Sequence, residues 1–432
     1  MAVKPITTLF LLKSSAVIMI GSLITGVINY LFTIVMARLL SPESFGSVAS
    51  LLSWIAILGF PASVISMHMA RQTAIFLTSH ERQRLQELSR KINFVSFLGI
   101  IILSVILVTV HYTGFFPEDW TFNYVLLISI IIGFSLLTAV NSGLLHGSQY
   151  FFRLSLLALI AALLKFFLAG ILVANGYDVY GVVVALAASS AISYIFSLWL
   201  TRRLFWSSPA QAASEALIKT PGGSSQYLPY IFTALFLLLL LQNIDIILAK
   251  HWLDAAAGYY AVLSTAGKVI VFGTAAISGV VFPSAAQTAA SGSGQEKRIL
   301  KISMSTIMLI VIGTVGLYLI IPEKIITTIF GSDYLPAASH LGHIGIIASL
   351  WAIIQLYVRL LLAKGNRAFL IPLFLLIAAE VAGISIWHQS IASILLVLFI
   401  TGAALTLSLA FIYQRTIFTK PQPVLPPNNL AI

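Results

Sequence analysis

Twelve long apolar segments dominate the 432-residue sequence. A membrane-spanning helix needs about 20 mostly apolar residues, because each residue adds about 1.5 Å of rise. Only 9% of the residues are charged, whereas a soluble domain has about 25%, so this chain cannot present a wetted surface. The predicted fold class is an all-α polytopic membrane protein with about twelve transmembrane helices: Ser15–Met36, Val48–Met69, Ile92–Val110, Tyr124–Leu145, Leu154–Ala174, Tyr180–Leu200, Leu228–Ala249, Tyr259–Phe282, Ile302–Ile321, Leu341–Leu362, Phe369–Trp387 and Ile391–Tyr413.

Two short motifs recur at about half the length of the chain. Arg38 to Gly46 aligns with Lys250 to Gly258 at an offset of 212, and Leu145 to Phe151 resembles Ala363 to Phe369 at an offset of 218. Duplicated halves are typical of membrane transporters. We therefore expect two six-helix lobes, residues 1–206 and 227–415, joined by a cytoplasmic linker at 207–226 and followed by a disordered Pro-rich tail at 416–432.

Lys and Arg are distributed unevenly between the two sides of the predicted membrane. With a cytoplasmic N-terminus, 18 of them fall in inside segments and three in outside segments. Cytoplasmic loops of membrane proteins carry such an excess, so we predict a multi-pass protein of the cell inner (cytoplasmic) membrane with both termini cytoplasmic. Topology also accounts for the net charge of +11, so we expect no nucleic-acid partner. Because six is even, the halves should form a parallel repeat.

Five ionisable side chains fall inside the predicted spans. Each costs about 2.5–3.5 kcal/mol at mid-membrane and should face the bundle interior or a cavity. Two interpretations are open: buried ion pairs that fasten helices, or cavity lysines that bind an anionic head group. Lys165 would pair with Glu380, and Asp245 with Lys268; Arg359 also fits a snorkelling interfacial residue.

Other candidate residues are a polar group in the first span and helix-bending or helix-ending residues in later spans. Asn29 is expected either to hydrogen-bond to another helix or to contact sugar hydroxyls. Pro61 predicts a kink in the second span, because proline removes a donor and clashes with the preceding turn. Gly273 marks the matching eighth span as flexible, and Arg71 closes the second span. We take Pro61, Arg71 and Gly273 as gate or hinge candidates.

Motifs of the common enzyme classes are missing from the sequence. We find no Walker loop, no HExxH and no paired carboxylates in one accessible loop, and there is no cysteine. The sequence therefore predicts no catalytic residues, no metal and no cofactor, and any pumping is expected to be secondary.

Several stretches resemble a known family. The run INYLFTIVMARLLSPESFGSVASL, Arg71 and the run LLHGSQYFF resemble the polysaccharide-transporter branch of the multidrug/oligosaccharidyl-lipid/polysaccharide exporter superfamily. Members include bacterial flippases for O-antigen and other lipid-linked oligosaccharides. The resemblance implies a V-shaped, two-lobe carrier with a cationic central cavity. The related lipid II flippases usually carry two additional helices, which this sequence lacks.

The resemblance implies a flippase that moves a polyprenyl-diphosphate-linked oligosaccharide across the membrane by alternating access, for synthesis of lipopolysaccharide or a related polysaccharide. Expected partners are this anionic substrate, membrane lipids and H⁺ or Na⁺, with a polysaccharide polymerase complex as a further candidate. A multidrug or small-molecule antiporter of the same superfamily and a membrane glycan polymerase are the alternatives. The residue-level candidates for substrate binding are Arg38, Lys165, Lys268, Asn29 and Arg359, and those for ion coupling are Asp245 and Glu380.

Overall fold

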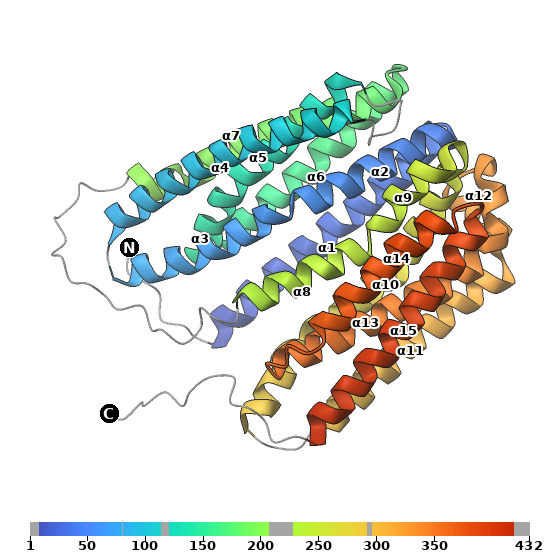
Figure 1. Cartoon of the computed structure of the whole chain (residues 1–432). Helices are drawn as coiled ribbons and strands as arrows, with labels where there is room; N and C mark the ends of the chain where they lie inside the picture. The colour runs from blue at the N-terminus through green and yellow to red at the C-terminus, as the bar shows by residue number, and fades with distance from the viewer. Residues whose placement is uncertain (1–7, 80, 114–120, 207–227, 292–295, 419–432) are drawn as a thin grey trace. The chain divides into compact units, whose positions relative to one another are not determined.

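The computed structural model describes residues 8–79, 81–113, 121–206, 228–291 and 296–418, and all regular structure within these ranges is helical (Figure 1). Ten helical runs there are long and apolar enough to cross a membrane. One of them, Pro229–Thr274, covers nearly all of the predicted span Leu228–Ala249 and most of Tyr259–Phe282, and the shorter helix Leu370–Ile386 supplies another span. The prediction of an all-α polytopic membrane protein is confirmed.

The chain forms two compact units. The first comprises Met1–Leu40 and Trp54–Ala216, and the second comprises Ser41–Ser53 and Leu217–Ile432. The helical run Pro42–Thr78 is therefore divided between the units. Its residues up to Ser53 belong to the second unit, and those from Trp54 belong to the first. The linker predicted at 207–226 and nearly all of the tail predicted at 416–432 lie outside the described residues, so the division into lobes of 1–206 and 227–415 stays a prediction.

Six helices and the last part of α2, from Trp54 to Leu58, make up the described part of the first unit. Within it α3 packs on α5, α5 packs on α4 and α7, and α6 packs on α1 and α7. Part of its core lies where Met69 on α3 meets Val140 and Leu144 on α5. The helices are α1 (Thr8–Leu39), α2 (Pro42–Leu58), α3 (Phe60–Thr78), α4 (Arg82–Tyr112), α5 (Phe122–Gly147), α6 (Phe151–Ala174) and α7 (Asp178–Trp206).

The second unit pairs its helices in the same order. There α10 packs on α13, α13 packs on α11 and α15, and α14 packs on α15, α8 and α9. We take α8 and α9 together as the counterpart of α1, and α10 as the counterpart of α3. Each main helix pairing of the first unit then has a counterpart in the second; for example, α3 on α5 corresponds to α10 on α13. The helices are α8 (Leu228–Leu241), α9 (Ile244–Leu253), α10 (Ala257–Ser291), α11 (Glu296–Ile320), α12 (Pro322–Ile329), α13 (Leu341–Ala363), α14 (Leu370–Ile386) and α15 (Ile391–Phe418).

Helix breaks follow the predictions only in part. The interruption predicted at Gly59-Phe60-Pro61 is present, because α2 ends at Leu58 and α3 begins at Phe60. Near Gly273, where flexibility was predicted, α10 continues without a break, and the role of this residue as a hinge stays a prediction. Glycine lowers helix propensity but, unlike proline, keeps its backbone donor. The second unit breaks instead between α8 and α9, at Gln242 and Asn243, whose side-chain amides hydrogen-bond to the carbonyls of Leu238 and Leu239.

The prediction that Arg71 ends its helix was wrong. Arg71 lies inside α3, which continues to Thr78, and its role as a gate residue stays a prediction. The prediction placed the end of the helix at the end of the apolar run. A helix can continue beyond the apolar layer, because long polar side chains keep their charged ends in water. The short helix α12 and the 3₁₀ segment Ser332–His340 were also not predicted.

Both repeated motifs mark junctions between helices. Arg38 to Gly46 spans the end of α1 and the start of α2, and Lys250 to Gly258 spans the end of α9 and the start of α10. The two aligned glycines meet inside the second unit: a Cβ on Gly46 would lie 2.8 Å from the Gly258 nitrogen, and a Cβ on Gly258 would overlap the Pro42 carbonyl. The repeated glycine therefore permits a close helix crossing.

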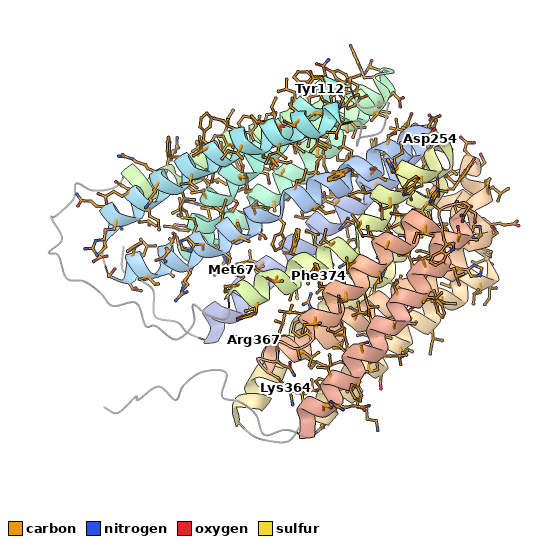
Figure 2. All side chains as sticks on the ribbon, in the orientation of Figure 1. Met67, Tyr112, Asp254, Lys364, Arg367 and Phe374 are labelled. Atoms are coloured by element: carbon orange, nitrogen blue, oxygen red, sulfur yellow. The ribbon has the colours of Figure 1, made fainter. Side chains whose placement is uncertain are left out.

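Large apolar side chains cover much of the outer surface of the helices. Phe94, Leu309 and Leu407 keep 69%, 74% and 71% of their surface exposed. Such a surface suits lipid rather than water, and the chain is a multi-pass membrane protein. Within the second unit, Asp254 lies at one end and Lys364 and Arg367 lie at the opposite end (Figure 2).

Candidate functional site

A cavity of about 440 Å³ lies among the helices of the first unit. Its apolar lining includes Ile55, Ile131 and Leu186. Its polar lining comes from α1, α3, α5, α6 and α7 and combines one cation, one amide and several hydroxyls: Asn29, Ser66, Ser135, Thr138, Ser142, Lys165, Ser189, Ser190 and Ser193. The structure therefore brings together two of the predicted substrate-binding candidates, Asn29 and Lys165.

Lys165 is held at this cavity by two neighbours on α1. Its Nζ donates a hydrogen bond of 2.6 Å to Oδ1 of Asn29 and lies 4.5 Å from the centroid of the Phe32 ring. The contact with the ring is a cation–π interaction, which partly offsets the cost of removing the ammonium group from water. An amide oxygen does not neutralise the lysine, so the cavity carries a positive charge at this point.

The hydroxyl groups of the lining were not among the predicted site residues. On α7, Ser193 lies four residues after Ser189 and three after Ser190, and on α5 Ser135 and Ser142 are seven residues apart. Residues three, four or seven positions apart lie on the same side of a helix. A count of polar residues by helix face could have found this set, whereas the search for charged groups did not.

A second group of buried polar residues lies in the second unit. Asp245 on α9 is fully buried and accepts a 2.6 Å hydrogen bond from the hydroxyl of Tyr260 on α10. Glu380 on α14 is 1% exposed and lies within range of an electrostatic interaction with Asp245. Lys268 donates a long hydrogen bond of 3.4 Å to Oδ1 of Asn243 and interacts electrostatically with Asp245.

Two carboxylate oxygens in this group are buried and have no hydrogen-bond partner among the described residues: Oδ1 of Asp245 and Oε1 of Glu380. A buried carboxylate oxygen without a hydrogen-bond partner is costly, so groups with such an oxygen commonly take up a proton or a cation. Sequence reasoning named Asp245, Glu380 and Lys268, but it missed Tyr260.

The remaining candidates are not among the residues that line the cavity or among the contacts described for the second group. Arg38 is exposed at the end of α1, and Arg359 is partly buried on α13. Pro61 and Arg71 lie on α3, and Gly273 lies on α10 at an exposed position. Their proposed roles in binding or gating stay predictions.

Solved structures of transporters share this fold. A multidrug resistance MATE family transporter of the MOP superfamily in its inward-facing conformation matches with a TM-score of 0.67 and 14% identity, covering 90% of this chain and 95% of the transporter. The lipid II flippase MurJ in an inward closed conformation matches with a TM-score of 0.65 and 13% identity, covering 93% and 89%. A MOP superfamily transporter from Pyrococcus furiosus gives a TM-score of 0.56 and 13% identity, covering 96% of each chain. At these identities the likeness establishes the fold, which is that of MOP superfamily transporters.

The family follows from the sequence. The family described as "Polysaccharide biosynthesis protein" matches residues 11–289, which is more than half of the 432 residues, and the chain belongs to this family. A search of curated proteins finds no match. The predicted relationship to the polysaccharide branch of the superfamily is thus confirmed, and the family and fold are those of a transporter rather than an enzyme.

Proposed function

We propose that this protein is a flippase for a polyprenyl-diphosphate-linked oligosaccharide, acting by alternating access in polysaccharide biosynthesis. The observation that carries the proposal is the cavity of the first unit. In a member of the polysaccharide biosynthesis family, it combines a lysine held by a neutral amide with a lining of hydroxyls. An anionic, sugar-bearing head group fits both features.

The diphosphate of such a substrate carries at least two negative charges. Lys165, with Lys268 and Arg38 as further candidates, would offset them, while the lipid tail stays in the bilayer. Outward movement of an anion is favoured by an inside-negative potential, by about 2.3 kcal/mol per charge per 100 mV. The membrane potential can therefore supply the driving force for flipping.

The architecture proposed for this carrier is V-shaped, with two six-helix lobes that form a parallel repeat around a central cavity. The recurrence of the helix pairings in both units supports the repeat, and the excess of Lys and Arg in the predicted inside loops supports cytoplasmic termini in the cytoplasmic membrane. In the second unit the acidic Asp254 and the basic Lys364 and Arg367 lie at opposite ends, consistent with that orientation (Figure 2). A polysaccharide polymerase complex is the proposed protein partner.

Coupling to H⁺ or Na⁺ is proposed for Asp245 and Glu380, because their unpartnered oxygens can take a proton or coordinate a cation. Replacing Asp245 by Asn keeps the shape but removes the charge. We expect Asp245→Asn to abolish any dependence of flipping on a pH or Na⁺ gradient while leaving the response to membrane potential in place. The measurement is the flipping rate in proteoliposomes under each gradient separately.

Asp333→Asn is the matched control, since Asp333 lies at an exposed position and accepts a hydrogen bond of 3.4 Å from the hydroxyl of Ser332 beside it. It should flip as the wild type does. An Asp245→Asn variant that keeps full ion dependence would remove this residue from coupling.

Deletion of the gene tests the function in cells. We expect loss of surface polysaccharide and accumulation of the lipid-linked glycan, with its sugar facing the cytoplasm, because synthesis continues while flipping stops. Drug sensitivity should not change. Increased drug sensitivity with normal polysaccharide would instead indicate the antiporter alternative, and accumulation of single repeat units on the outer face would indicate the polymerase.

A further inference from the structure

We propose that the cavity of the first unit is a sugar site of defined polarity: its serines accept hydrogen bonds from sugar hydroxyls, and Lys165 with Asn29 binds an anionic oxygen group on the same ligand. The inference rests on the proposed function and specifies which part of the substrate this cavity binds. The anionic group is a carboxylate on the sugar or the phosphate attached to it, and both present the same chemistry to the lysine.

The directions of the hydrogen bonds establish the serine half of the site. A hydroxyl has one proton and two lone pairs. Ser190 donates its proton to the carbonyl of Ala187 at 2.8 Å, and Ser193 donates to the carbonyl of Ser189 at 2.6 Å. Ser189 likewise donates to Leu186 at 3.0 Å. With their protons committed to the helix backbone, these oxygens offer lone pairs to a ligand.

The facing helix α5 repeats this arrangement at one position. Ser142 donates to the carbonyl of Thr138 at 3.0 Å, so its oxygen is also an acceptor, whereas the hydroxyl of Thr138 has no hydrogen-bond partner among the described residues. Phosphate and carboxylate groups only accept hydrogen bonds, and they gain nothing from such a lining unless the serines give up their backbone bonds. A sugar hydroxyl can donate to it directly. This part of the cavity therefore favours sugar hydroxyls over phosphate.

At Lys165 the cavity offers hydrogen-bond donors instead of acceptors. One of the three N–H groups of the ammonium is used by Asn29, which leaves two for a ligand, and the amide nitrogen of Asn29 is a further donor. Donors and a positive charge at one end, with acceptors along α5 and α7, match a hydroxylated ring that carries one acidic group.

Serines that bond to their own helix also occur where membrane helices pack closely. These serines differ because they line a cavity of about 440 Å³, within the range of about 300–1,000 Å³ of small-molecule sites. Ser408 on α15 has the same kind of bond, to the carbonyl of Ala404 at 2.8 Å, but lies outside the cavity. It provides a matched control.

The experiment measures binding of four probes to the full-length protein in lipid nanodiscs by saturation-transfer NMR: glucose, glucuronate, glucose 1-phosphate and inorganic phosphate. The variants are Ser142→Ala with Ser190→Ala, each single change, Lys165→Met and Ser408→Ala. We expect the double serine variant to weaken all three sugars by about threefold to tenfold per hydroxyl lost. Lys165→Met should weaken the acidic sugars and leave glucose unchanged, and Ser408→Ala should bind like the wild type.

Glucuronate and glucose 1-phosphate distinguish the two sources of the anionic group. The probe that carries the same anionic group as the substrate should bind more tightly, and its affinity should fall further in Lys165→Met. Unchanged sugar binding in the folded single and double serine variants, or phosphate binding as tight as that of the sugars, would overturn the inference. Flipping of the lipid-linked glycan is measured in parallel. Normal flipping by the wild type together with either of those results rejects the sugar site alone, whereas a wild type that does not flip rejects the proposed function.

Discussion

Replacing Lys165 by Met is expected to reduce glycan export by about 10- to 100-fold. A hydrogen bond to a charged group contributes about 1.5–3 kcal/mol, and the apolar methionine fills a similar space without the charge. In the structure this charge is held by Asn29 and Phe32 at the edge of a hydroxyl-lined cavity. The measurement is the amount of surface polysaccharide in a deletion strain that expresses the variant, normalised to the amount of protein in the membrane.

Controls separate loss of binding from loss of structure. Lys165→Arg keeps the charge and should retain part of the export. Lys301→Met removes a lysine that is exposed on α11 and should export normally. If Lys165→Met is present at normal levels and exports as the wild type does, the lysine does not contact the substrate.

The second large effect is expected at the glycine crossing of the second unit. A Cβ on Gly258 would overlap the carbonyl of Pro42, and backbone cannot yield as a flexible side chain does. Overpacking of this kind costs about 1–3 kcal/mol and sometimes more, so Gly258→Ala should lower the melting temperature and the yield of folded protein in detergent.

Gly26→Ala is the control for this prediction, because a Cβ on Gly26 meets nothing within 4 Å. Alanine is the better helix former, so this variant should be at least as stable as the wild type. A Gly258→Ala protein that melts as the wild type does would show that the helices can separate at this crossing without cost.

The helices could be predicted from the sequence because the bilayer fixes their length and leaves few polar residues inside it. The break at Gly59-Phe60-Pro61 was also predictable, since proline has a known effect on helices. The break at Gln242 and Asn243 was not, because these side chains end α8 through local bonds to its own carbonyls, and the same residues also occur within helices. The pairing of the repeated glycines required the three-dimensional structure.

The site was predictable to the extent that it depends on charge. The cost of burying an ionisable group identified Lys165, Asp245 and Glu380, and position in the first span identified Asn29. The serines were missed because each costs little in the membrane when bonded to its own helix. Tyr260 was missed because it was counted as an apolar residue, although its hydroxyl bonds to Asp245.

The central claim is that this protein moves a lipid-linked glycan between leaflets without changing it chemically. It is tested most directly with purified protein in proteoliposomes that carry a labelled polyprenyl-diphosphate glycan, whose sugar is detected outside by a membrane-impermeant glycosidase. We expect the inner pool of glycan to become accessible with time, faster under a potential that drives the anion outward, while its mass stays unchanged until the enzyme is added. An inner pool that stays protected in the presence of correctly folded wild-type protein would contradict the claim.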